Sequence, residues 1–198
     1  MLDTKRYWFE KIEKSVGKFF SSFSLQPNDY TLLSLFFAFF SFYFLTKRNL
    51  FLSLFFFLFA SFLDFIDGAV ARNKNLTTKK GAYLDTICDR YVEGFLILGI
   101  LFLPLPEILF PHYFWLFLIL FGAMMTTYAK ASAKEKDLTF QELKGGILSR
   151  GERVILLVLS LILGIFSFVL MTYLLIFIAL LTNITALQRV KSALSKNL

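Results

Sequence analysis

Long runs of apolar residues, broken by short polar segments, occupy most of the chain after residue 28. A helix needs about 20 residues to cross the hydrocarbon core of a bilayer. The charge-free stretch from Val154 to Gln188 is too long for one crossing, so it predicts two spans joined by a tight turn near residues 167–172. The whole pattern predicts six membrane-spanning helices: roughly 29–46, 50–71, 81–104, 112–132, 151–168 and 171–189.

Two of these predicted spans contain charged side chains. The apolar stretch 49–63 is too short to cross alone, so the second span must continue through Asp64 and Asp67. The stretch 94–106 is also too short, so the third span must begin near residue 81. That span then carries four charged residues: Asp85, Asp89, Arg90 and Glu93. An ionisable group at the centre of a membrane helix costs about 2.5–3.5 kcal/mol on insertion scales, and such groups are usually functional.

The first 22 residues show a different pattern. Aromatic and aliphatic residues recur at helical spacing, and lysines and Arg6 fall largely between them. This pattern predicts an amphipathic helix that lies in the membrane interface. We expect it to be an anchor that takes no part in chemistry.

The composition supports a membrane protein and excludes most other classes. Of the 198 residues, 57% are hydrophobic and 19% are aromatic. Globular domains have about 45–50% apolar residues, so a soluble domain, a disordered chain and a coiled coil are excluded. A disulfide scaffold is excluded because Cys88 is the only cysteine. We therefore predict an all-α integral membrane protein with one domain across residues 1–198.

The formal net charge of +7 indicates orientation rather than nucleic-acid binding. Nearly all Lys and Arg residues fall in segments that the six spans place on one side of the membrane. Only Lys47 and Arg48 fall on the other side, and Arg90 lies within a span. By the positive-inside rule, both termini and the nearby acidic site face the cytoplasm of the cell. We expect contact with membrane lipid and none with nucleic acid.

The intramembrane aspartates form two pairs on helix faces. Asp64 and Asp67 are three residues apart, and Asp85 and Asp89 are four apart, so each pair lies on one face. If the two faces meet, four carboxylates converge and repel one another unless protons or cations neutralise them. Oxygen ligands suit Mg²⁺ or Mn²⁺, and two such ions would cancel the charge. The sequence thus predicts a two-metal centre of the kind used in phosphoryl transfer.

The residues around these aspartates resemble a known signature. The chain reads Asp64-x2-Asp67-Gly68-x2-Ala71-Arg72-x8-Gly81-x3-Asp85-x3-Asp89, which is similar to the motif of the CDP-alcohol phosphotransferases. The resemblance implies an enzyme that displaces CMP from a CDP-linked donor by means of an alcohol acceptor. It also implies a homodimer within the membrane.

The same resemblance implies roles for individual residues. Asp64, Asp67 and Asp85 would hold the metals. Asp89 would lie near the second metal and act as the general base. Gly68, Ala71 and Gly81 would admit the cytidine, and Arg72 would contact the donor diphosphate. The small residues also have a simpler interpretation, which is close packing of helices.

The acceptor and donor are left open by the sequence. Residues 127–134 and 146–153 resemble the branch of the family that accepts inositol phosphate. The candidate ligands for the acceptor phosphate are basic: Lys130, Lys134, Arg150 and Arg153. These residues could equally be cytoplasmic anchors. The donor could be CDP-diacylglycerol, its archaeal ether-lipid counterpart or CDP-inositol.

Two alternative functions are compatible with parts of this pattern. The same chemistry could use glycerol 3-phosphate or serine as acceptor. A cation transporter could use the aspartates as an ion path, but it would not need the Gly68, Ala71 and Arg72 placement.

Overall fold

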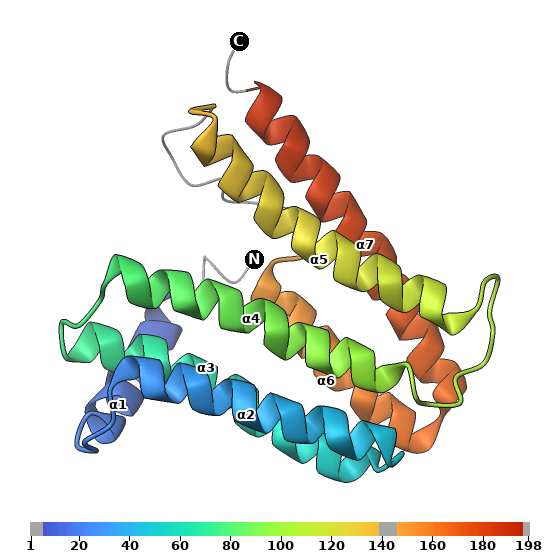
Figure 1. Cartoon of the computed structure of the whole chain (residues 1–198), viewed down its shortest axis with the longest axis horizontal. Coiled ribbons are helices and arrows are strands. Elements are labelled where there is room, and N and C mark those ends of the chain that lie inside the picture. The colour runs from blue at the N-terminus through green and yellow to red at the C-terminus, as the bar shows by residue number, and fades with distance from the viewer. Residues whose placement is uncertain (1–5, 139–145, 196–198) are drawn as a thin grey trace.

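The computed structural model describes residues 6–138 and 146–195, and their regular structure is entirely helical. Seven helices follow one another in these residues (Figure 1): α1 (Arg6–Phe20), α2 (Pro27–Thr46), α3 (Leu50–Asn73), α4 (Lys79–Ile100), α5 (His112–Glu135), α6 (Arg150–Phe166) and α7 (Phe168–Ser195). The predicted all-α class is therefore confirmed.

Four of the helices, α2, α3, α5 and α7, are long and apolar enough to cross a membrane. The protein is an integral membrane protein. Helix α4 differs because acidic and basic residues interrupt its sequence, and α6 differs because it has only 17 residues. The count of six spans stays a prediction.

Local side-chain chemistry explains where the helices begin. Asn49 accepts a hydrogen bond from the backbone of Leu52 at the start of α3, and Thr78 caps α4 in the same way. At α6, Ser149 and Glu152 form a reciprocal capping box. These polar residues satisfy backbone N–H groups that the first turn of a helix leaves without partners.

Three helix boundaries differ from the predicted ones. Helix α4 ends at Ile100 rather than near residue 104. The predicted turn at 167–172 is much shorter, because only Ser167 is extended and Phe168 already begins α7. The hydroxyl of Ser167 accepts a hydrogen bond from the backbone N–H of Leu170, which lets the next helix start at once. Helix α7 also continues to Ser195, beyond the predicted end at 189.

The helices pack in two groups that share one hydrophobic core. Helix α2 packs against both α3 and α4, while α5 pairs with α7 (Figure 1). Helix α6 contacts α3 and α7, and so links the groups. The core between them contains large apolar side chains that are almost fully buried: Leu45, Phe57, Leu96, Leu157 and Met171. Many phenylalanines lie outside this core with exposed rings, as expected for surfaces that face lipid.

Helix α1 packs against the end of α3 that carries the acidic residues. Gly17 permits this contact, because a Cβ atom there would lie 2.6 Å from the carbonyl oxygen of Ala69. Val16 and Phe20 cover the buried Ile66 of α3 and its neighbours. The interfacial position of α1 stays a prediction, but its place beside α3 is a feature of the fold.

Gly99 allows α2 and α4 to approach closely. A Cβ atom at Gly99 would lie 2.6 Å from Cδ1 and 2.9 Å from Cβ of Leu45. By contrast, a Cβ atom at Gly94 on the same helix meets nothing within 4 Å. Small residues at helix crossings are a common device of membrane proteins.

We predict that Gly99→Val destabilises the protein by about 1–3 kcal/mol, because the added methyl groups overpack the α2–α4 contact. The measurement is the thermal unfolding midpoint of purified protein in detergent. Gly94→Val is the matched control, since it makes the same chemical change on the same helix. Equal unfolding temperatures for the two variants would contradict the prediction.

Candidate metal centre and substrate cavity

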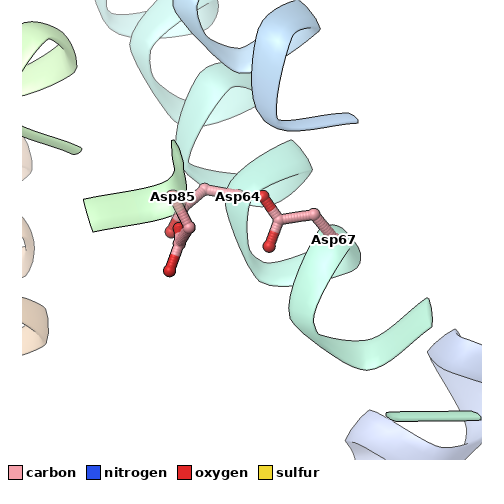
Figure 2. Close-up of side chains that lie close together, drawn as sticks. All are labelled: Asp64, Asp67 and Asp85. Atoms are coloured by element: carbon pink, nitrogen blue, oxygen red, sulfur yellow. The ribbon is translucent and has the colours of Figure 1, made fainter. Parts of the chain in front are cut away.

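Three carboxylates converge where α3 and α4 approach each other. Asp64 and Asp67 come from α3 and Asp85 from α4, and Figure 2 shows their carboxylates turned toward one another. One oxygen of each lies within 4.8 Å of one oxygen of the other two. Asp67 is buried, whereas Asp64 and Asp85 are partly buried.

Helix α2 fixes the orientation of one of these carboxylates. The hydroxyl of Thr31 donates a hydrogen bond of 2.6 Å to Oδ2 of Asp67. Both groups are buried, so this bond satisfies an oxygen that would otherwise be stranded in an apolar environment. Thr31 is the kind of supporting residue that holds a metal ligand in place. Sequence reasoning missed it because its partner lies on another helix.

The donor set of this cluster fits a divalent cation. Three closely spaced carboxylates supply hard, negatively charged oxygen ligands, which are those that Mg²⁺ and Mn²⁺ prefer. Their mutual repulsion in a poorly hydrated site also calls for a neutralising cation. The residues present therefore fit a metal centre.

Asp89 lies beside this cluster and shares a cation with it. Arg150, at the first turn of α6, donates hydrogen bonds of 3.1 and 3.0 Å to the two oxygens of Asp64. The same guanidinium forms an ion pair with Asp89. Three acids thus form the cluster and the fourth joins it through Arg150. The proposed roles of Asp89 as metal ligand and base stay predictions.

A cavity of about 160 Å³ opens next to the cluster. Asp67 and Asp85 form part of its wall. All four residues that were predicted to contact the CDP moiety line it: Gly68, Ala71, Arg72 and Gly81. The rest of the lining comes from the start of α2 and from the segment between α3 and α4.

Two glycines keep space open in this cavity. A Cβ atom at Gly81 would lie 3.1 Å from Oγ1 of Thr78 and 3.3 Å from Oδ1 of Asn28. A Cβ atom at Gly68 would lie 3.0 Å from Nη2 of Arg72. Both positions are tighter than ordinary contacts, so a side chain would displace polar groups of the lining. Gly68 and Gly81 therefore shape the cavity, which the simpler interpretation of close helix packing does not explain.

The structure gives Arg153 a partner that the sequence did not reveal. Arg153 is only 2% exposed. It donates hydrogen bonds of 2.6 and 3.1 Å to the two oxygens of Glu93, which is equally buried on α4. Arg90 pairs with the same carboxylate at 2.8 Å. Arg153 therefore takes part in a buried network of two arginines and one glutamate.

The other basic candidates lie on α5. Lys130 is partly buried and Lys134 is exposed. A further cation, Arg189 of α7, donates a hydrogen bond of 2.9 Å to the backbone of Thr126 and has Arg153 and Arg90 as charged neighbours. The sequence analysis did not single out Arg189, although its position at the very end of the predicted span 171–189 could have indicated it.

Comparison with known proteins supports the same interpretation. The family profile described as CDP-alcohol phosphatidyltransferase matches residues 24–185. An archaetidylinositol phosphate synthase of Pyrococcus horikoshii is 30% identical over 186 residues, which cover 90% of this chain and 88% of that protein. An uncharacterized protein of Aquifex aeolicus is 35% identical over 166 residues, covering 81% of this chain and 80% of the relative.

Solved structures share the fold. Phosphatidylinositol phosphate synthase of Mycobacterium tuberculosis, solved with manganese and citrate, has a TM-score of 0.80 and covers 92% of this chain and 89% of its own. The same protein with CDP-DAG bound has a TM-score of 0.77 and covers 92% of this chain and 94% of its own. The sequence identity in both cases is 24%, so the likeness is one of fold.

We predict that Asp67→Asn weakens Mn²⁺ binding by at least about tenfold, because it removes one of the three charged ligands of the cluster. Binding is measured by calorimetry or by electron paramagnetic resonance on purified protein without substrates. Asp137→Asn is the control, since Asp137 is exposed and lies outside the cluster. Equal Mn²⁺ affinity in the Asp67→Asn variant and the control would rule out a metal centre at this place.

Proposed function

The chain belongs to the CDP-alcohol phosphatidyltransferase family, and on that premise we propose that it transfers a substituted phosphate from a CDP-linked lipid to inositol phosphate. CMP is the leaving group. The oxygen of an acceptor hydroxyl forms a bond to the transferred phosphorus, and the bond from that phosphorus to the bridging oxygen of CMP breaks. The product is a phosphodiester, as in phospholipid biosynthesis.

One observation carries the proposal. Two carboxylates of the acidic cluster, Asp67 and Asp85, form part of the wall of the same cavity that is lined by the glycines, the alanine and the arginine of the family signature. A cation path requires acids but no adjoining cavity with a guanidinium at its rim. A transferase needs both, because the diphosphate must lie beside the metal ligands.

The cavity residues suit a cytidine diphosphate group. Gly68, Ala71 and Gly81 leave room for a flat ring, and Arg72 can donate paired hydrogen bonds to phosphate oxygens. The cavity lies between α2, α3 and α4, which we expect to cross the membrane, and this suits a donor whose acyl or ether chains remain in lipid. A CDP-diacylglycerol or its archaeal ether counterpart is therefore preferred to CDP-inositol.

Asp64, Asp67 and Asp85 would hold the divalent metal, Mg²⁺ or Mn²⁺, and two ions are expected once Asp89 takes part. When bound, such ions neutralise the charge of the phosphates and of the leaving group. Thr31 keeps the carboxylate of Asp67 in place for this purpose.

Asp89 is the proposed general base. It is buried beside the cluster, and its Oδ1 forms an ion pair with Nη2 of Arg150. This pairing holds the carboxylate in a fixed orientation next to Asp64, which contacts the same guanidinium. An acceptor hydroxyl that approaches from this side would lose its proton to Asp89 as it attacks the phosphorus.

The acceptor phosphate calls for cations on the same side. Arg150, Arg153, Lys130 and Lys134 remain the proposed ligands, joined by Arg90 and Arg189. The buried Glu93 forms ion pairs with two of these residues, Arg90 and Arg153. It therefore fixes the positions of their guanidinium groups and partly neutralises their charge. Inositol phosphate is favoured because the archaetidylinositol phosphate synthase relative aligns over most of both chains.

The remaining proposals concern the setting of the enzyme. We place both termini and the active site on the cytoplasmic side of the cell membrane, because the basic residues gather there. A homodimer within the membrane is expected from the family resemblance.

The test is a CMP-release assay on purified protein with pairs of donors and acceptors. We expect the highest rate with a CDP-linked lipid and inositol phosphate, and complete, reversible loss of activity with EDTA. Faster turnover with glycerol 3-phosphate or serine would overturn the assignment of inositol phosphate as the acceptor. Ion flux in proteoliposomes without CMP release from any pair would overturn the reaction itself.

We predict that Asp89→Asn lowers the rate of CMP release by about 10²–10⁴-fold, because the amide cannot accept the hydroxyl proton. The unfolding temperature serves as the check that the fold is retained. Cys88→Ser, a substitution at the neighbouring buried position, is the control for local disturbance. Near-normal turnover by Asp89→Asn would remove this residue as the base.

A further inference from the structure

Helix α1 contributes a charged side chain to the donor side of the site. Glu13 forms an ion pair with Nε of Arg72, the arginine at the rim of the cavity. Glu13 and Arg72 are far apart in the sequence and come from different helices. The amphipathic pattern of the first residues predicted only an anchor, so this contact is unexplained by the role assigned to α1.

The guanidinium of Arg72 is held in a defined orientation by this contact. Its Nε atom faces Glu13, whereas Nη1 and Nη2 lie over Gly68, at 3.4 and 3.0 Å from the place of a Cβ atom there. In the part of the chain that the structure describes, the two Nη atoms have no ion-pair partner. Gly68 also lines the cavity, so the paired N–H groups lie at its edge. That is the edge of a guanidinium that binds phosphate oxygens in pairs.

Other contacts hold α1 in register with α3, so the position of Glu13 is fixed. Gly17 packs against the backbone of Ala69. Just after α1, the hydroxyl of Ser21 accepts a hydrogen bond of 2.9 Å from Asn73. Lys74 donates hydrogen bonds of 3.2 Å to the backbone of Phe23 and Leu25. Helix α1 is therefore attached to the same end of α3 that carries Arg72.

We propose that Glu13 is a positioning residue for donor binding: it orients Arg72 so that its two Nη groups face the diphosphate of the CDP-linked donor. The inference rests on the proposed function, since it assigns the ligand of Arg72. Helix α1 then serves the site directly, because it orients Arg72, one of the cations of the site.

The physical benefit lies in conformational entropy. The side chain of Arg72 is 56% exposed, and a long exposed side chain loses many rotamers when it binds a ligand. Glu13 restricts those rotamers before the donor arrives, so less is lost on binding. Since Arg72 is more than half exposed to solvent, the pair adds little to folding stability. A positioning role and a structural role therefore predict different measurements.

The test compares wild-type protein with Glu13→Gln and Glu13→Asp. We expect Glu13→Gln to raise the KM for the CDP-linked donor about three- to tenfold, through an effect on binding before catalysis. The KM for the acceptor, kcat at saturating donor and the unfolding temperature should stay unchanged. Glu13→Asp keeps the charge, so its KM for the donor should lie between those of wild type and Glu13→Gln. Glu135→Gln, the same change at an exposed position on α5, is the matched control.

Direct binding of CDP in the presence of Mn²⁺, without an acceptor, separates this inference from the proposed function. Weaker CDP binding by Glu13→Gln than by wild type supports the positioning role even if no acceptor is turned over. An unchanged or lower donor KM and unchanged CDP binding would overturn it. A parallel rise of both KM values, or a lower unfolding temperature, would show a structural role instead. Absence of CMP release by wild-type protein would count against the proposed function alone.

Discussion

The organisation of this protein depends on the neutralisation of acidic side chains within a bundle of apolar helices. An isolated carboxylate in such a place is costly, so each one needs a cation or a hydrogen-bond donor. Arg150 supplies the cation for Asp64 and Asp89, and Arg153 supplies it for Glu93. The first turn of α6 is thereby tied to α3 and α4. The same interactions that stabilise this arrangement also place cations around the acids that the chemistry needs.

The sequence was sufficient to predict the acids but not their partners. Spacing of three and four residues put Asp64 with Asp67 and Asp85 with Asp89 on common helix faces, because helical geometry fixes neighbours along one helix. Which helix faces which is decided by packing over the whole bundle. The pairing of Glu93 with Arg153, and of Thr31 with Asp67, therefore could not be read from spacing.

Helix existence was predicted more reliably than helix ends and contacts. The apolar runs located the six helices from α2 to α7, since hydrophobic length is a property of the sequence alone. The early end of α4 at Ile100 and the abrupt start of α7 after Ser167 depend on local backbone geometry. The docking of α1 was missed for a related reason: an amphipathic stripe indicates that a face is covered, but not by what. The contact depends on Gly17, which lets α1 lie against the backbone of Ala69, and a glycine in an amphipathic stripe does not indicate which helix it will contact.

The acidic cluster divides the site into two sides with different surroundings. Asp67 and Asp85 line the cavity, whose rim carries the solvated pair of Arg72 and Glu13. Asp64 does not line the cavity and is paired with Arg150, on the first turn of the helix that also carries Arg153, the partner of the buried Glu93. Displacement at phosphorus needs the attacking and leaving oxygens on opposite sides of the reacting atom. A donor in the cavity and an acceptor near Arg150 would meet this requirement with the metal ligands between them. The open side suits the entry of the CDP-linked donor and the release of CMP. The buried side suits an acceptor hydroxyl that must be shielded from water.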